Sequence, residues 1–373
     1  MKKILSLVLV LVMVLALAAC GTPAAPAKPG GDGKETDAPK AGVELNVGVF
    51  YYHYADAYIS TVRDNMDKQL NEAKIKFTNF DGNNNQATQL DQINTAITNG
   101  VNLLIVNIVE TGSPDSAQAA SKAAETAGIP IIFFNREVDS EIVKAYAKSA
   151  FVGTDAAEAG HLQGKLIGDT LVKDFDKYDL NKDGKISYVM FKGQEGNPEA
   201  DFRTKYGVED ADAVLKEAGK PALEFYDSAN SSKYLVDPDG AWSAKAATDY
   251  MNTILASYSE ANKNMIELII ANNDNMAEGA VAALNVVGYN LGDGKSVTIP
   301  VFGVDALDTA KQKIEEGKMA GTIMQDAVGM ATTIMTLVKN VAEGADLMAN
   351  TDKFVVDKDV FKIRVPYGVY TAK

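Results

Sequence analysis

The sequence has 373 residues, carries a formal net charge of −14 at pH 7 and contains a single cysteine. This length exceeds that of one typical domain and fits two. A strongly acidic chain has no attraction for nucleic acid and little for anionic lipid surfaces, and one cysteine cannot form an internal disulfide. We therefore expect two domains, no nucleic-acid partner, and stability that comes from the core or from a metal ion.

The N-terminal segment predicts export. Two lysines precede an apolar run over residues 4–17, which is short for a membrane span and typical of a signal peptide over residues 1–19. Leu-Ala-Ala-Cys at 17–20 has the form of a lipobox, so Cys20 is expected to become the lipidated N-terminus; an ordinary signal peptide is the alternative. Residues 20–43 lack large apolar side chains almost completely and should form a flexible tether.

Beyond the tether, apolar runs of strand length alternate with amphipathic stretches of helical period. The predicted strands are Leu45–Phe50, Lys76–Phe80, Leu103–Ile108, Ile129–Phe134, Ala150–Gly153, Ile186–Phe191, Ala222–Tyr226, Ile266–Ala271, Ile299–Gly303 and Gly321–Met324. The predicted helices include Ala57–Leu70, Thr88–Asn99, Ser116–Ala127, Ala156–Val172, Pro198–Ala218, Ser243–Tyr258 and Met276–Val287. This pattern indicates an α/β fold with parallel sheets covered on both faces, in which ligands bind beyond the carboxyl ends of the strands.

Polar and aromatic residues follow nearly every predicted strand. They are Tyr52, Asp56, Tyr58, Asn135, Asn197, Glu199, Arg203, Asn272, Asn273, Asp274, Asp305, Gln325 and Asp326, and the only tryptophan, Trp242, precedes a helix. Carboxylates and amides accept hydrogen bonds from sugar hydroxyls, arginine and asparagine donate to them, and flat rings stack on the C–H faces of a sugar. Taken singly, such residues are more often turn or cap residues. Their number indicates a sugar site.

Residues 179–187 resemble most of an EF-hand calcium loop. Asp179, Asn181 and Asp183 stand at positions one, three and five, a glycine stands at six, and the Lys185 carbonyl and Ser187 stand at seven and nine. Position twelve is methionine instead of glutamate, so the missing carboxylate must come from elsewhere. An Asx-rich surface turn is the alternative. The spacing favours a calcium ion as a cofactor.

Common enzyme motifs are absent from the sequence. No G-x-G-x-x-G or P-loop follows a strand, and no G-x-S-x-G or H-E-x-x-H motif occurs. The two histidines, His53 and His161, have no suitable nucleophile beside them. Asp56 and Glu199 could form the acid–base pair of an exported glycoside hydrolase. Their amide-rich surroundings favour binding, so we predict a binding protein that is not an enzyme.

Taken together, these motifs resemble the galactose/glucose-binding proteins of the periplasmic binding-protein class, which serve sugar ABC transporters. The resemblance covers Val47 to Val369 and is carried by Val47-Gly48-Val49, Tyr52-x-Tyr54-x-Asp56, Phe133-Phe134-Asn135-Arg136-Glu137, Val152-Gly153-Thr154-Asp155, the loop from Asp179 to Gly184, Ala271-Asn272-Asn273-Asp274 and the segment from Pro300 to Ala306. It implies a two-lobe type I periplasmic binding protein fold with three crossovers, near Thr154, Gln325 and Arg364. The lobes would comprise residues 44–154 plus 326–363, and 155–325 plus 364–373.

The resemblance also implies roles for the site residues. Asp56 and Asn135 would bind sugar hydroxyls from the first lobe, and Tyr58 and Trp242 would stack on the two faces of the ring. From the second lobe the hydroxyl-binding residues would be Glu199, Arg203, Asn273 and Asp305. The remaining members of the implied site are Tyr52, Asn197 and Gln325. Glu267 would supply the carboxylate that the calcium loop lacks.

Several positions depart from the family pattern in size while keeping polar or aromatic character. Asn197 stands where the family has histidine, Glu199 where it has aspartate, Gln325 where it has asparagine and Tyr58 where it has phenylalanine; in the calcium loop, Ser187 replaces a longer amide. The chain is expected to be a monomeric lipoprotein, anchored through Cys20 outside the cell membrane. It would capture glucose, galactose or both for an ABC permease, with a chemoreceptor as a further candidate partner. A protein specific for ribose, xylose or another small polar ligand is the alternative.

Overall fold

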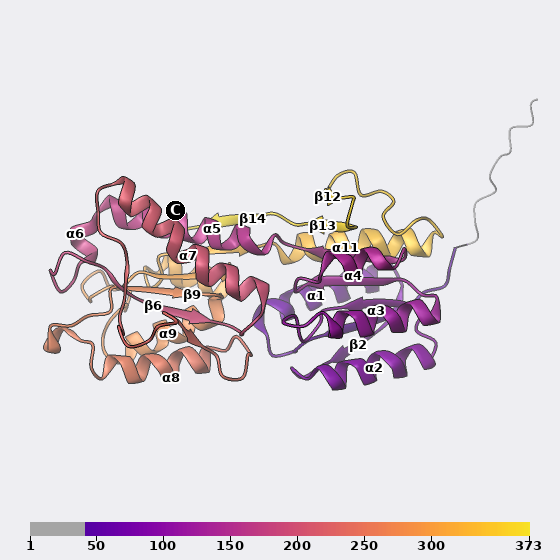
Figure 1. Ribbon diagram of the computed structural model, residues 1–373, viewed down its shortest axis with the longest axis horizontal. Coiled ribbons are helices and arrows are strands. Elements are labelled where there is room, and N and C mark those ends of the chain that lie inside the picture. Colours follow the sequence, from indigo (N-terminus) through magenta and orange to yellow (C-terminus); the bar gives the residue numbers. More distant parts are fainter. Residues whose placement is uncertain (1–41) are drawn as a thin grey trace, which may run out of the picture. The chain divides into compact units, whose positions relative to one another are not determined.

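The computed structural model describes residues 42–373, in which two mostly parallel β-sheets are each covered by helices (Figure 1). The predicted signal peptide, Cys20 and nearly all of the predicted tether lie outside the described residues. We call the part built on the first sheet the first lobe and the part built on the second sheet the second lobe. This arrangement confirms the predicted α/β fold with two helix-covered sheets.

The first sheet has seven strands in the order β12-β13-β5-β4-β3-β1-β2. Their bounds are β1 Asn46–Tyr51, β2 Lys76–Asp81, β3 Leu103–Val106, β4 Ile131–Asn135, β5 Ser149–Gly153, β12 Val355–Asp357 and β13 Lys362–Arg364. All neighbours pair in parallel except β12 and β13. The helices of this lobe are α1 Ala57–Glu72, α2 Gln86–Thr98, α3 Asp115–Ala127, α4 Ser140–Ala145 and α11 Ala327–Ala342.

The second sheet has the order β14-β11-β10-β9-β6-β7, with β8 also paired to β6. The strand bounds are β6 Ser187–Lys192, β7 Glu224–Phe225, β8 Leu235–Val236, β9 Leu268–Ala271, β10 Val301–Asp305, β11 Gly321–Gln325 and β14 Tyr367–Tyr370. Only β14 runs antiparallel to its neighbour. The helices are α5 Ala156–Lys173, α6 Phe175–Tyr178, α7 Pro198–Glu217, α8 Ala244–Leu255, α9 Asp274–Val286 and α10 Asp308–Glu315, with a 3₁₀ turn at Glu260–Asn262.

The chain passes between the lobes three times. It leaves the first sheet after β5 and continues into α5, which packs on β10, β11 and β14. It returns after β11 through α11, which packs on α1, β4 and β5, and it crosses again between β13 and β14. The Thr154 hydroxyl of the first crossing donates a 2.8 Å hydrogen bond to the Tyr367 hydroxyl of the third, so two crossings are tied together.

Short polar side chains begin the helices that follow the strands. Asp56, Asn197 and Asn273 each accept a backbone N–H of the first turn of α1, α7 and α9, respectively. Such caps satisfy N–H groups that have no partner within the helix. Because a helix begins near the carboxyl end of the preceding strand, the caps gather polar groups at that edge of each sheet.

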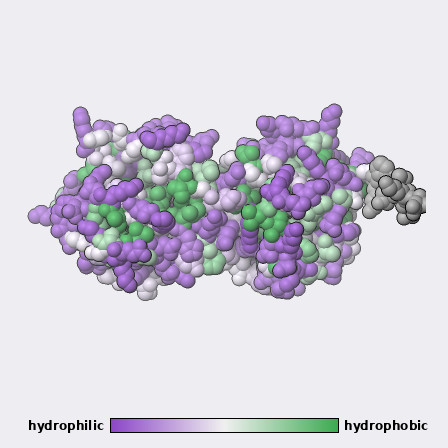
Figure 2. All heavy atoms as spheres, turned by 90° about the horizontal axis from the view of Figure 1, so that it is seen from above, coloured by the Kyte–Doolittle hydropathy of each residue, from purple (hydrophilic) through white to green (hydrophobic). Residues whose placement is uncertain are grey.

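The face of the molecule seen in Figure 2 is largely hydrophilic, with hydrophobic side chains in separate patches. Within residues 42–373, no helix combines the length and the apolar character that a membrane span requires.

Candidate functional site

A small cavity lies between the two lobes. Its walls are formed by Tyr52, Asp56, Tyr58, Ile59, Asn135 and Arg136 of the first lobe and by Asn197, Glu199, Arg203, Trp242, Asn273, Asp305 and Gln325 of the second. All eleven residues predicted for the ligand site therefore line one cavity.

Arg136 lines the cavity although it is not among the residues predicted for the site. Its guanidinium lies 4.1 Å from the centre of the Tyr52 ring and donates to the backbone carbonyls of Ile108 and Val109. Burial lowers the pKa of Arg136. Its position directly after Asn135, at the end of a buried strand, was the signal that could have identified it.

Asp56 is held in place by two hydrogen bonds. Its Oδ1 accepts the backbone N–H of Ile59 at 2.7 Å, and its Oδ2 accepts the Tyr52 hydroxyl at 2.6 Å. Burial raises the pKa of Tyr52, and the neighbouring Asp56 charge raises it further. Tyr52 therefore keeps its proton and remains a donor. The bonds fix the carboxylate at the cavity wall, where each oxygen keeps lone-pair capacity for a ligand hydroxyl.

The aromatic walls of the cavity come from both lobes. Tyr58 is in the first turn of α1, and its hydroxyl lies 3.8 Å from the Met330 sulfur. Trp242 has a positive φ of 56° immediately before the N-cap of α8 and is 7% exposed. Its backbone carbonyl accepts the side-chain amides of Asn273 and Asn275 at 3.3 and 3.2 Å. The two rings give the cavity apolar faces that match the C–H faces of a sugar.

Three buried polar atoms of the cavity residues have no hydrogen-bond partner: Glu199 Oε2, Arg203 Nε and Gln325 Nε2. Leaving such atoms unpaired costs free energy, so the site favours a ligand that pairs with them. Glu199 Oε2 needs a donor, whereas the arginine and amide nitrogens need acceptors. A hydroxyl group serves as either.

The charges of the cavity are nearly balanced. Burial raises the pKa of Asp305, and the nearby Arg203 guanidinium opposes this shift. Burial also raises the pKa of Glu199, with a further contribution from Glu137. Arg203 donates to the Asn272 carbonyl at 2.9 Å and to the Tyr367 hydroxyl at 2.9 Å, so its orientation is fixed by the protein. Carboxylates and guanidinium groups in one small cavity favour a neutral polar ligand over an ion.

Asn197 and Asn273 line the cavity but already use both ends of their amides. Asn197 Oδ1 accepts the Ala200 N–H at 3.0 Å, while its Nδ2 donates to the Thr111 hydroxyl of the first lobe at 3.2 Å. Asn273 caps α9 and donates to the Trp242 carbonyl. In this structure, both residues therefore position neighbouring groups.

The loop of residues 179–187 lies beside Glu267. Glu267 Oε1 accepts the Asn181 N–H at 3.1 Å, and Oε2 accepts the Ser187 N–H at 2.9 Å. Asp179 accepts the N–H groups of Asp183 and Gly184. Within the described part of the chain, no cluster of three or more His, Cys, Asp or Glu side chains has the arrangement of a metal site. The gathered donors are all oxygens, which is the ligand chemistry of calcium.

Residues 47–346 match the family model of the periplasmic binding protein domain. The D-galactose/methyl-galactoside binding periplasmic protein of Haemophilus influenzae is 35% identical over 322 residues, which cover 86% of this chain and 88% of the relative. The ribose import binding protein of Bacillus subtilis is 23% identical over 329 residues, or 87% and 88% of the two chains. An ABC transporter solute binding protein from Clostridium phytofermentans with bound β-D-glucose has a TM-score of 0.66 and 21% identity, covering 88% of this chain and 94% of that structure.

Proposed function

Because the chain belongs to the periplasmic binding protein family, we propose that it binds a hexose in the cavity between its lobes and delivers it to a sugar ABC transporter. It is a binding protein and not an enzyme, since the relatives that it matches are named for ligands that they bind. The glycoside hydrolase alternative is therefore wrong. The observation that carries the proposal is the set of unpaired buried atoms on Glu199, Arg203 and Gln325 inside this cavity.

A hexose meets each requirement of the cavity. Its hydroxyls can donate to Glu199 Oε2 and accept from Arg203 Nε and Gln325 Nε2, and its C–H faces can stack on Tyr58 and Trp242. Contacts to both lobes at once make the ligand bind the closed form more tightly than an open form, so binding shifts the population toward closure. The transporter would then distinguish the closed from the open protein.

Glucose, galactose or both are the proposed sugars. The Haemophilus influenzae relative, at 35% identity, is named for galactose and methyl-galactoside. By resemblance, the Asp56 carboxylate would accept the hydroxyl of the fourth carbon in either epimer, and Asn135 would reach toward the sixth carbon. Ribose or xylose lacks that carbon, and a site built for a hydroxyl rejects a ligand without it.

We further propose that Cys20 carries a lipid anchor and that one calcium ion binds the loop. Asp179, Asn181, Asp183, the Lys185 carbonyl, Ser187 and Glu267 would hold the ion. When bound, it supplies positive charge where several carboxylates and carbonyls meet. Because Ser187 begins β6 and Glu267 directly precedes β9, the ion would tie the loop to two neighbouring strands of the second sheet.

The test is a calorimetric titration of the protein with glucose, galactose, xylose and ribose under identical conditions. The expected result is tight binding of one or both hexoses at one site per chain, with pentoses bound much more weakly. Tighter binding of ribose than of both hexoses would favour the pentose alternative. Absence of binding to every sugar would overturn the proposed function.

A further inference from the structure

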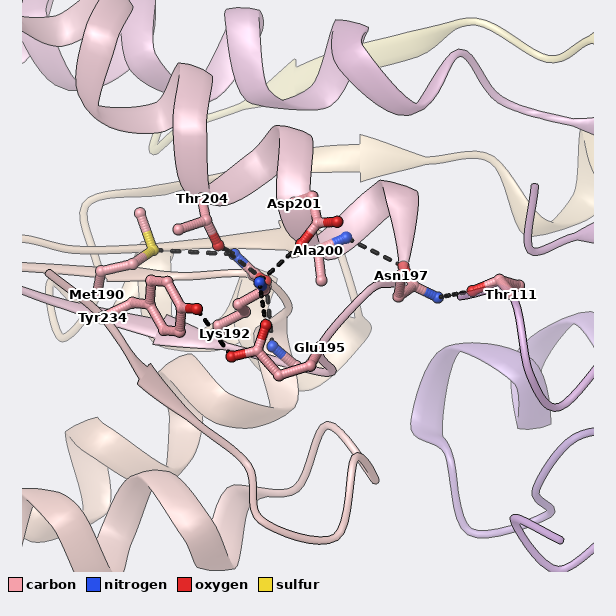
Figure 3. Close-up of polar contacts among 11 residues, drawn as sticks. Thr111, Met190, Lys192, Glu195, Asn197, Ala200, Asp201, Thr204 and Tyr234 are labelled. Carbon is pink, nitrogen blue, oxygen red and sulfur yellow. Dashed lines mark hydrogen bonds and ion pairs between the residues drawn. The ribbon is translucent and has the colours of Figure 1, made fainter. Parts of the chain in front are cut away.

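The segment Gln194–Glu199, which joins β6 to α7, bonds to the first lobe through three of its side chains. Gln194 Oε1 accepts the Arg136 guanidinium, and Asn197 Nδ2 donates to the Thr111 hydroxyl at 3.2 Å. Glu199 Oε1 accepts the backbone N–H of Glu137 at 2.8 Å. Figure 3 shows Asn197 extending from this segment toward Thr111. All three bonds join protein to protein and need no ligand atom.

The backbones of the two lobes also meet at this segment. A Cβ atom placed on Gly112 would lie 3.4 Å from the Gly196 carbonyl oxygen. The loop after β3 therefore lies beside the segment, at a distance where an added Cβ would be in ordinary van der Waals contact. Hydrogen bonds and backbone contact to the first lobe thus occur together in Gln194–Glu199. We call these residues the closing segment.

The closing segment is fixed within its own lobe by a buried lysine. The Lys192 ammonium, with its side chain 6% exposed, lies 2.6 Å from Glu195 and 2.6 Å from Asp201 (Figure 3). The Tyr234 hydroxyl donates to Glu195 at 2.8 Å, and the backbone N–H of Gly193 donates to Asn272 at 3.1 Å. Because the lysine is buried while both carboxylates are about half exposed, the ammonium needs these partners, and this cluster should hold the segment in one conformation.

The partners in the first lobe are fixed as well. Arg136 is buried and bonded to backbone carbonyls of its own lobe. The Glu137 carboxylate is held by Arg364 at 2.6 and 3.0 Å and by Lys362 at 2.5 Å. Since both sides are held in place before they meet, little side-chain entropy remains to be lost on contact, which increases the net gain from each bond.

We propose that the closing segment is a ligand-independent latch, in which Thr111 and Gln194 are positioning residues that stabilise the closed protein without contacting the ligand. Neither residue lines the cavity. The apparent dissociation constant of a ligand rises when the binding-competent form is less populated. Residues of the latch therefore set part of the affinity for every ligand. This inference rests on the proposed function.

Glu199 connects the latch to the ligand site. One oxygen of its carboxylate accepts from the first lobe, and the other is the unpaired buried atom of the cavity. This glutamate is one methylene longer than the aspartate of the family pattern. The longer side chain reaches across to Glu137 and keeps an oxygen for a sugar hydroxyl.

The first experiment compares Thr111→Val and Gln194→Leu with the control Thr126→Val. Thr126 is on α3, and its hydroxyl bonds within the same helix to the Lys122 carbonyl. In calorimetry, each latch variant should bind glucose and galactose about threefold to tenfold more weakly, the effect of one lost hydrogen bond. The factor should be the same for both sugars, and Thr126→Val should bind as wild type. The proposal would be overturned if the loss of affinity in a latch variant differed between glucose and galactose. It would also be overturned if both latch variants bound the sugars as wild type does.

The second experiment measures the distance between the lobes without sugar. Spin labels are placed at Lys122→Cys and Lys245→Cys, both exposed positions in different lobes, in the full chain carrying Cys20→Ser. The unliganded protein should show a short-distance population that Thr111→Val reduces and Thr126→Val does not. Identical distance distributions in all three proteins would refute the latch. Because no ligand is needed, this test remains valid even if sugar binding itself is disproved.

Discussion

Gly193 lies directly against the indole ring of Trp242, since a Cβ atom on Gly193 would stand 2.1 Å from a ring carbon. The ring thus packs directly against the backbone of Gly193, at the start of the loop after β6. The positive φ of Trp242 and the two asparagines on its carbonyl fix the ring from the other side. One glycine therefore determines where the aromatic wall of the cavity stands.

Gly193→Ala should weaken hexose binding by about tenfold or more, because a methyl group at this position has to displace the Trp242 ring. The chain contains one tryptophan, so its fluorescence reports on this site alone. The variant should show a shifted emission maximum without sugar and a raised dissociation constant in calorimetry. Wild-type emission together with wild-type affinity would contradict the role given to Gly193.

Trp242→Ala should abolish measurable hexose binding and leave the protein folded. Removing the ring exposes one C–H face of the sugar to water and takes away the stacking surface. Binding is measured by calorimetry, and circular dichroism confirms the fold. A variant that binds hexose as tightly as wild type would show that the ring does not stack on the ligand.

Glu199→Gln should weaken hexose binding by roughly tenfold to a hundredfold, the effect of losing a hydrogen bond to a charged acceptor. The amide oxygen of the variant can still accept the Glu137 N–H, but an NH₂ donor then replaces the oxygen that has no partner. Glu209→Gln, at an exposed carboxylate on the same helix and outside the cavity, is the matched control. Equal affinity of the two variants would argue against a hydroxyl donor at Glu199.

The stability of the second lobe should depend on pH through Asp274. Burial raises the pKa of Asp274 to about 7, although its oxygens accept the Thr322 hydroxyl and the Leu307 N–H. A carboxyl whose pKa is raised by folding favours the folded state at low pH. Its contribution is complete below about pH 4, the unfolded value, and is lost as the pH rises to about 7.

Asp274→Asn should remove this dependence, because the amide can keep one acceptor for Leu307 and one donor for Thr322. Urea unfolding at pH 5 and pH 8 gives the measurement. The free energy of unfolding of wild type should fall between the two pH values by more than that of the variant. An equal fall in both proteins would assign the dependence to other groups.

Calcium should bind once per chain, and chelation should lower the melting temperature. Glu267→Gln should reduce calcium affinity at least tenfold, since the loop has no carboxylate of its own at position twelve. The readout is the calcium-dependent part of the melting temperature, because Gln also disturbs the bonds to the Asn181 and Ser187 N–H groups. An unchanged calcium affinity in Glu267→Gln would show that Glu267 is not a calcium ligand.

Much of the fold could be predicted because the central strands are continuous apolar runs. Leu103–Val106 is buried at every residue, and ten of the thirteen polar and aromatic residues that follow the strands line one cavity. By contrast, β8, β12, β13 and β14 have two to four residues each, too few to show a period. Helix α11 is also missing from the predicted helices; its buried residues include five of the six from 333 to 338 and Asn340, so this part of the helix is a nearly continuous buried run.

The site could be predicted as a set of residues but not as a set of bonds. Asn197 and Asn273 carry the amides expected of sugar ligands, yet they cap helices and hold Thr111 and the Trp242 carbonyl. Which groups remain unpaired depends on the tertiary contacts of each atom. For example, Glu199 Oε1 accepts the backbone N–H of Glu137, which is 62 positions away in the sequence, and only Oε2 is left without a partner.

Both sheets are completed by the last strands of the chain. β12 and β13 form one edge of the first sheet, and β14 forms one edge of the second. During synthesis neither lobe can acquire its full hydrogen-bonded edge until residues 355–370 have left the ribosome. This topology therefore keeps the edges of both lobes incomplete until nearly all of the described residues have been made.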